Sequence, residues 1–176
     1  MDTVELERSL EAHHAESFGW ALACCNRDYA DAEDVLQIAY LKVLDGRARF
    51  DGRSGFRTWL FAVIRRTALE RFRWKRAYAR VTALFGMDVV AAAPPEVEER
   101  LQRSETAARL LRALSTLARR QREVLELVFY HDFTIEQSAE TLGISIGSAR
   151  VHYERGKKRL LERLTDEEER VAFASA

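Results

Sequence analysis

The chain has 176 residues, of which 47% are hydrophobic, and its 28 basic and 28 acidic residues give a formal net charge of zero. This length and apolar content predict one large or two small buried cores, and a neutral chain does not by itself indicate a nucleic-acid partner. Residues 1–5 lack the basic start and apolar core of a signal peptide, and no apolar run approaches the roughly 20 residues that span a bilayer. We therefore predict a cytoplasmic protein with no membrane contact.

The charges are unevenly distributed along the first half of the chain. Residues 1–45 carry three bases and ten acids, a net of −7, whereas residues 46–80 carry eleven bases and two acids, a net of +9. This reversal between neighbouring segments predicts an acidic face for one partner and a basic face for another.

Helical patterns account for nearly the whole chain. An amphipathic helix is predicted at residues 4–25, then a turn at residues 26–30 and a second helix that Asp31 caps and Gly46 ends. Further helices are predicted at residues 54–80, 96–117 and 119–130. The only prolines, at residues 94–95, lie in an Ala-rich stretch that is the candidate linker. The sequence has no strand pattern and no repeat, so we expect an all-α fold, with two small helical domains joined by a flexible linker.

Residues 47–80 interleave basic and aromatic side chains. The aromatic residues are Phe50, Phe56, Trp59, Phe61, Phe72, Trp74 and Tyr78, and the basic ones are Arg53, Arg57, Arg65, Arg66, Arg71, Arg73, Lys75 and Arg76. In single-stranded nucleic-acid sites, cations follow the phosphates and aromatic rings stack on unpaired bases, each stack contributing roughly 1–3 kcal/mol. Part of the pattern is structural, because one helical arc holds Phe56, Leu60, Val63, Ile64 and Thr67, which we predict to be core. Arg53 and Arg57, beside the loop, are better candidates for nucleic-acid contact.

No catalytic, cofactor or metal-binding pattern is visible in the sequence. Helix capping and an acidic docking surface explain Asp31, Glu33 and Asp34, with a metal site as the alternative. Neighbouring helical residues point about 100° apart, so Cys24 and Cys25 are expected to be small buried hydrophobic residues, with a redox switch as the alternative. The four histidines have no metal-ligand spacing. We predict a binding protein, not an enzyme, with no cofactor and no metal.

Residues 134–163 predict a helix-turn-helix, a unit whose second helix lies in the major groove of DNA. Thr134 and Gln137 have the spacing of a capping box at the start of the first helix. Gly143 supplies the left-handed residue that ends this helix, and Ser145 caps the second one.

The second helix of this unit has two distinct faces. The arc predicted to face the core holds Ile146, Ala149, Tyr153, Gly156, Leu160 and Leu164, and the opposite face holds Ser148, Val151, His152, Arg155, Lys158 and Arg159, with Arg150 and Glu154 on the flank. Residues 145–163 carry six bases and two acids, a surplus of four positive charges. The alternative, a solvated helix with ordinary surface charge, does not explain the caps, the glycine turn and the basic face together.

Four motifs in register resemble a known family. They are Asp-Ala-Glu-Asp-Val-Leu-Gln at residues 31–37, Phe-Asp-Gly-Arg-Ser-Gly-Phe-Arg-Thr-Trp-Leu at residues 50–60, Leu-Ala-Arg-Arg-Gln-Arg-Glu-Val-Leu at residues 117–125, and the helix-turn-helix. In this order and spacing the chain resembles a bacterial extracytoplasmic-function (ECF) sigma factor, a small member of the sigma-70 family. The resemblance covers about residues 10–164.

The resemblance implies an alternative sigma factor that binds core RNA polymerase, at the clamp of its largest subunit and the flap of its second. Asp31, Asp34 and Gln37 would contact the clamp. The implied organisation is sigma region 2 at residues 1–82, a linker at residues 83–104, sigma region 4 at residues 105–165 and a tail at residues 166–176. The linker, with Glu96, Glu98, Glu99 and Glu105 near its end, would thread toward the active-site cleft of the polymerase.

The resemblance also implies two promoter contacts. Region 2 would open the −10 element and hold the non-template strand, with one base flipped into a pocket beside residues 53–56. Its implied contact residues are Phe50, Arg53, Ser54, Phe56, Arg57, Trp59, Arg65 and Arg66. Region 4 would read the −35 element as duplex DNA. Its implied contact residues are Arg119, Arg120, Arg122, Ser145, Ser148, Arg150, Val151, Glu154, Arg155, Lys158 and Arg159.

The sequence departs from the family pattern in places. Ile38 stands where an acid is frequent, which puts the detail of polymerase docking in doubt. Val151, His152 and Glu154 replace residues that are often Ser, Arg and an apolar or aromatic residue, and a carboxylate in the groove can accept a hydrogen bond from cytosine N4. The segment after Leu164 is short, so we expect regulation by a separate anti-sigma factor.

Three other functions account for the sequence less well than the sigma-factor hypothesis does. A plain helix-turn-helix regulator that binds only duplex DNA does not account for the basic and aromatic residues 50–78. A sigma mimic that titrates an anti-sigma factor usually carries a receiver domain, for which this helical chain has no room. A nucleic-acid enzyme would need a set of metal-binding carboxylates that the sequence lacks.

Overall fold

The computed structural model describes residues 3–84 and 105–174, which form eight α-helices and no strand, so the predicted all-α fold is confirmed. The chain divides into two units, Met1–Glu96 and Val97–Ala176. The flexible linker predicted at residues 83–104 lies outside the described residues, except for residues 83 and 84, which belong to a helix. None of the described helices is long and apolar enough to cross a bilayer.

The N-terminal unit contains α1 (Thr3–Ala12), α2 (His14–Cys24), α3 (Tyr29–Leu44) and α4 (Phe56–Leu84). The prediction of one helix at residues 4–25 was wrong, because the chain breaks at His13, where φ is −104° and ψ is 9°. The His13 ring Nδ1 donates to the Ser9 carbonyl oxygen over 2.8 Å, and this carbonyl also accepts the His13 backbone N–H. The side chain therefore competes for a helix acceptor at the break.

The start of α3 also differs from the prediction. The N-cap is Asp28, whose carboxylate accepts the backbone N–H of Asp31 over 2.9 Å. Asp31 is thus in the first turn of the helix and does not cap it. Asn26 and Arg27, with φ of 53° and 66°, reverse the chain before the cap.

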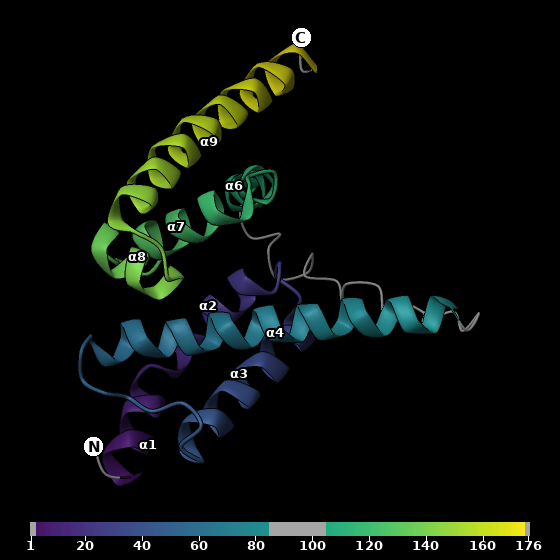
Figure 1. Cartoon of the computed structure of the whole chain (residues 1–176). Coiled ribbons are helices and arrows are strands. Elements are labelled where there is room, and N and C mark those ends of the chain that lie inside the picture. Colours follow the sequence, from purple (N-terminus) through teal and green to yellow (C-terminus); the bar gives the residue numbers. More distant parts are fainter. Residues whose placement is uncertain (1–2, 85–104, 175–176) are drawn as a thin grey trace. The chain divides into compact units, whose positions relative to one another are not determined.

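The core of the N-terminal unit is centred on Trp20, which has no exposed surface. Its indole N–H donates to the Phe61 carbonyl oxygen over 3.0 Å, and its ring stacks on the Phe61 ring with centroids 5.7 Å apart. Figure 1 shows α4 lying across α2 and α3 and continuing beyond them. The predicted core arc of α4 is confirmed for Leu60, Val63, Ile64 and Thr67, all buried, whereas Phe56 is only half-buried.

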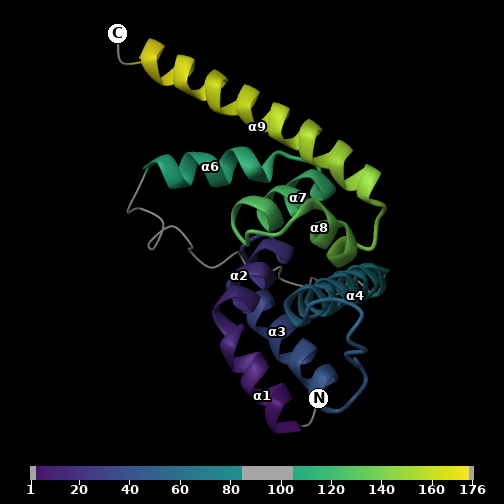
Figure 2. The ribbon, with the colours of Figure 1, turned by 90° about the vertical axis from the view of Figure 1, so that its left-hand side faces the viewer.

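The C-terminal unit contains α6 (Glu105–Ser115), α7 (Arg119–Phe129), α8 (Ile135–Leu142) and α9 (Ile146–Ala174) (Figure 2). The predicted capping box is confirmed, since Thr134 Oγ1 accepts the Gln137 N–H over 3.1 Å and Gln137 Oε1 accepts the Thr134 N–H over 2.9 Å. Gly143 is left-handed, with φ of 62°, as predicted. At Gly156 a β-carbon would lie 3.1 Å from atoms of Gln121 and Leu125, so the glycine lets α9 approach α7 closely.

Helix α9 is longer than the sequence analysis predicted. The segment expected to be a tail at residues 166–176 is helical as far as Ala174. It contains no glycine or proline, so nothing in the sequence ends the helix after Leu164.

Candidate nucleic-acid interface

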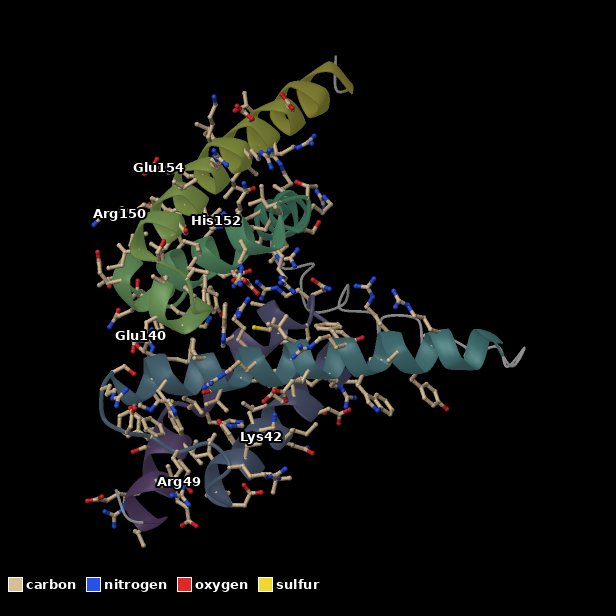
Figure 3. All side chains as sticks on the ribbon, in the orientation of Figure 1. Lys42, Arg49, Glu140, Arg150, His152 and Glu154 are labelled. Atoms are coloured by element: carbon tan, nitrogen blue, oxygen red, sulfur yellow. The ribbon has the colours of Figure 1, made fainter. Side chains whose placement is uncertain are left out.

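A cavity of about 430 Å³ lies in the N-terminal unit between the end of α3, the loop after it and α4. It is lined by Lys42, Arg47, Ala48, Arg49, Trp59, Val63, Arg66, Thr67 and Glu70, and we refer to it as the loop pocket. Figure 3 labels Lys42 on α3 and Arg49 on the loop. Lys42 Nζ donates to Thr67 Oγ1 over 3.2 Å and to Glu70 Oε2 over 2.5 Å. Glu70 is the only acid in the lining, against four bases, so the loop pocket favours an electronegative ligand.

The loop that forms one wall of this pocket is shaped by turns and an aromatic cluster. Gly46 and Gly52 both have φ of 74°, a conformation that suits glycine. The Asp45 carboxylate accepts the Arg47 backbone N–H over 3.2 Å and Arg47 Nε over 2.7 Å; these bonds close the first turn and also lower the pKa of Asp45. Phe50, from the loop, packs against Phe56 and Trp59 of α4 with ring centroids 5.5 and 5.3 Å away. The aromatic residues therefore anchor the loop on α4.

The arginines predicted to contact the −10 element differ in accessibility. Arg53 and Arg66 are exposed, and Ser54 is half-buried in the loop. Arg57 Nε lies 2.9 Å from Glu16 Oε2 of α2, and its guanidinium lies over the Phe61 ring. Arg65 is only 5% exposed, which corrects its assignment as a surface contact: its place on α4 faces the core of the unit.

The residues predicted to dock on the polymerase also differ in how far they are buried. Asp34 and Gln37 are exposed on α3. Asp31 is largely buried, and its carboxylate accepts hydrogen bonds from Lys75 and, over 3.4 Å, from Arg71 Nε. Arg71 also pairs with Asp34. Asp31 thus ties α3 to α4 and presents little surface to a partner.

In the C-terminal unit, the outward face of α9 carries the predicted groove residues. The exposed residues of this face include Ser145, Ser148, Arg150, Val151, Glu154, Arg155, Lys158 and Arg159. Figure 3 shows Arg150 and Glu154 on the side of α9 that points away from α7. Ala149 and Gly156 are buried as predicted, but Ile146 is exposed, because at the first helical position it lies beyond the packed part of α9.

Ion pairs and caps hold this helix in place. Ser145 caps α9 as predicted, since its Oγ accepts the Ser148 N–H over 3.1 Å. Arg150 Nη2 lies 3.4 Å from Glu136 Oε1 of α8. The pKa of Glu136 is lowered, first by its own backbone N–H, then by the Thr134 hydroxyl and Arg150. The two helices of the motif are therefore linked by complementary charges.

The arginines of α7 have two different surroundings. Arg119 is exposed and Arg122 is half-buried. Arg120 Nη1 donates to the Leu142 carbonyl oxygen over 3.2 Å, and so satisfies an acceptor at the end of α8.

Helix α9 is bonded to α7 in a similar way, because Arg159 of α9 donates to Gln121 Oε1 over 3.3 Å. A second cavity, of about 330 Å³, is lined by Gln121, Arg155, Lys158, Arg159 and Glu162.

Metal and thiol chemistry find no support among the described residues. No group of three His, Cys, Asp or Glu side chains in that part of the chain could hold a metal ion. Neither cysteine forms a disulfide within the described residues, and Cys24 is half-buried whereas Cys25 is buried. Burial, reinforced by Asp31 and Asp28, raises the pKa of Cys25 to about 12, so its thiol is inert at neutral pH.

The contributions of Lys42, Arg49 and Glu16 were not predicted from the sequence. Lys42 and Arg49 line the loop pocket, and Glu16 pairs with Arg57 from a different helix. The only signal in the sequence was that Lys42 and Arg49 lie close to the boundary between the acidic segment 1–45 and the basic segment 46–80. Nor were Phe129 and Tyr130, exposed aromatic residues at the end of α7, predicted as part of the site.

Comparison with known proteins identifies the family. The sigma-70 region 2 profile matches residues 10–78, and the sigma-70 region 4 profile matches residues 107–160. The RNA polymerase sigma factor CarQ of Myxococcus xanthus is 32% identical over 167 residues, which are 93% of this chain and 91% of CarQ. The chain belongs to the sigma-70 family, as an ECF sigma factor. SigX of Bacillus subtilis, an ECF RNA polymerase sigma factor, is 28% identical over 155 residues, covering 82% of this chain and 80% of SigX.

Solved structures share the fold of this ECF sigma factor. The sigma factor RpoE of Bartonella quintana, in complex with the anti-sigma factor NepR, superposes with a TM-score of 0.72 at 22% identity, over 92% of this chain and 97% of RpoE. CnrH, in complex with the cytosolic domain of CnrY, superposes with a TM-score of 0.65 at 20% identity, over 94% of this chain and 90% of CnrH.

Proposed function

We propose that this ECF sigma factor binds core RNA polymerase, directs it to promoters and promotes DNA melting, without catalysis of its own. The N-terminal unit would hold the −10 element as a single strand, and the C-terminal unit would read the −35 element as duplex. The observation that carries the proposal is the loop pocket, whose four bases and one aromatic ring suit an unpaired, electronegative base beside its phosphates.

The geometry of the loop pocket supports a flipped base. Its volume of about 430 Å³ is within the range of about 300–1,000 Å³ for small-ligand sites. Trp59 would stack on the base, while Lys42 and Arg66 donate to its edge. Arg53 on the exposed loop and Arg57 beside it would contact the phosphates. Among the other −10 residues, Phe50, Ser54 and Phe56 would position the loop, and buried Arg65 would stabilise α4.

In the C-terminal unit, the exposed face of α9 supports duplex recognition. Arg150, Val151 and Glu154 would lie nearest the base edges, together with Ser148 and Arg155. The phosphates would be bound by Arg119, Arg122, Ser145 and Lys158. Arg120 and Arg159 would act chiefly by holding α7 against α8 and α9, because each is bonded within the unit.

Docking on the polymerase would use exposed residues of both units. On α3, Asp34 and Gln37 lie on the surface, together with Leu41 and Leu44, which are exposed apolar residues. We assign this surface to the clamp of the largest subunit, with Asp31 positioning α4 beneath it. In the C-terminal unit, the exposed Phe129 and Tyr130 suit the flap of the second subunit, since aromatic residues are enriched at protein interfaces.

Run-off transcription tests this proposal. Core RNA polymerase is incubated with genomic fragments, with and without the protein, and the transcripts are mapped. We expect new discrete start sites, and their alignment would give both promoter elements. If no start site appears while the protein still binds duplex DNA, it is a plain helix-turn-helix regulator. If it binds neither polymerase nor DNA but captures an anti-sigma protein, it is a sigma mimic.

An anti-sigma partner is part of the proposal. The solved structures of RpoE with NepR and of CnrH with the CnrY cytosolic domain are sigma factors bound to such partners. An anti-sigma factor for this chain would cover the polymerase-docking residues of α3. Addition of the purified partner should then abolish the new start sites, and extra core polymerase should restore them.

A further inference from the structure

Two exposed aromatic side chains on α4 have no role in the function proposed above. Trp74 is 64% exposed and Tyr78 is 49% exposed. Their rings stack on each other, with centroids 5.4 Å apart and an interplanar angle of 12°. Clustered large apolar side chains at the surface mark an interaction site more often than isolated ones do.

The aromatic pair lies on the face of α4 that also lines the loop pocket. At 100° per residue, Val63, Thr67 and Glu70 of the pocket fall within an arc of about 80° that includes both aromatic residues. The rise from Trp59, on which the pocket base would stack, to Trp74 is about 22.5 Å, which equals about seven nucleotides at the stacked spacing of about 3.4 Å. A strand with one base in the pocket therefore reaches the pair within about seven nucleotides.

The charges beside the pair suit a nucleic-acid strand. Arg66 and Arg73 are both exposed and seven residues apart, and at 100° per residue they lie about 80° and 100° from Trp74, so they form a row along one side of it. On the other side, Arg71 and Lys75 are bound to the carboxylates of α3. Exposed cations thus follow one edge of the face, as phosphates would require, and the aromatic rings occupy its centre.

We propose that Trp74 and Tyr78 form a second binding site for unpaired nucleobases, continuous with the loop pocket along α4. This inference rests on the proposed function, and it extends the single-stranded contact by about seven nucleotides toward the end of α4. The arginine row binds the phosphates between the two sites. The occupant is single-stranded DNA, because the site continues a cationic pocket that already suits an unpaired base.

Binding of oligonucleotides of two lengths tests the proposal. Fluorescein-labelled oligothymidylates of 4 and 12 nucleotides are titrated with the full chain, alone and bound to core RNA polymerase, and anisotropy is recorded. A stack contributes about 1–3 kcal/mol, so we expect Trp74→Ala with Tyr78→Ala to weaken the 12-mer by about 5- to 150-fold or more. The 4-mer, which fills only the loop pocket, should change less than twofold. Trp74→Phe should retain most of the affinity for the 12-mer.

Controls separate this site from the proposed function and from misfolding. Leu161→Ala removes a similarly exposed apolar side chain from α9 and should leave both affinities unchanged. Circular dichroism melts show whether the aromatic variant remains folded. If it binds both lengths as the wild type does, the second site is wrong while the −10 proposal stands. If the wild type binds neither length in either form, both fail.

Photocrosslinking identifies the occupant directly. Single 5-bromodeoxyuridine substitutions are placed along the 12-mer, and the crosslinked peptides are mapped by mass spectrometry. We expect crosslinks to Trp59 and to Trp74 or Tyr78 from positions about seven nucleotides apart. If the aromatic variant loses affinity for core polymerase and none for the 12-mer, the pair is a protein contact and the proposal is overturned.

Discussion

Replacing Asp31 with asparagine distinguishes the polymerase contact that the sequence predicts from the internal ion pairs that the structure contains. The Asp31 side chain is 13% exposed and is bound by Arg71 and Lys75, which are themselves partly exposed. Removing one partner of a buried pair costs about 3–5 kcal/mol, and an exposed pair contributes about 0–1 kcal/mol. The intermediate burial here leads us to expect Asp31→Asn to lower the free energy of unfolding by about 2 kcal/mol.

The sequence offers a direct probe of this loss. All three tryptophans, Trp20, Trp59 and Trp74, lie in the N-terminal unit, so their fluorescence reports the unfolding of that unit alone. A loss of about 2 kcal/mol corresponds to a fall in Tm of about 8–16 °C for a domain of this size. Asp34→Asn, at the exposed end of the same network, is the matched control and should cost less than about 1 kcal/mol.

Affinity for core polymerase is measured in parallel, at a temperature where both variants are folded. We expect Asp34→Asn and Gln37→Ala to weaken it more than Asp31→Asn does. If Asp31→Asn leaves the urea midpoint unchanged and abolishes polymerase binding, the ion pairs contribute nothing and our reasoning from burial is refuted.

Three further predictions concern other parts of the chain. The pKa of Cys25 is raised from 9.0 in the unfolded chain to about 12 in the folded one. Burial of the neutral thiol therefore contributes its full stability below about pH 9, and this contribution is lost as the pH rises toward 12. The unfolding free energy of the wild type should therefore fall by about 2 kcal/mol more than that of Cys25→Ala between pH 9 and pH 10.5, and parallel curves would contradict this. Thr134→Ala, which removes the capping box, should lower the free energy of unfolding of the C-terminal unit by about 1 kcal/mol, measured by urea unfolding followed by circular dichroism. A decrease below about 0.3 kcal/mol would rule out the cap as a stabilising contact. Glu154→Ala should change the preferred −35 sequence in transcription from a randomised −35 library, and an unaltered preference would exclude Glu154 from promoter choice.

Features that depend on local sequence were predictable. The capping box at Thr134, the left-handed Gly143 and the Ser145 cap each follow from hydrogen bonds within one turn of helix, so residue type and spacing are enough to place them. The buried arc of Leu60, Val63 and Ile64 follows from helical periodicity in the same way. The break at His13 escaped prediction because a side chain that competes for a backbone acceptor leaves the apolar period unchanged.

The residues of the candidate site were only partly predictable, because their accessibility depends on how separate helices cross. The basic residues of segment 46–80 are enough to predict that α4 is positively charged. Only the packing of α4 on α2 and α3, however, buries Arg65 and pairs Arg57 with Glu16. The loop pocket likewise joins Lys42 to residues more than 20 positions later in the chain. Ion pairs and cavities of this kind arise between surfaces that meet only in the folded unit, whereas caps and periodic faces are set by neighbours along one helix.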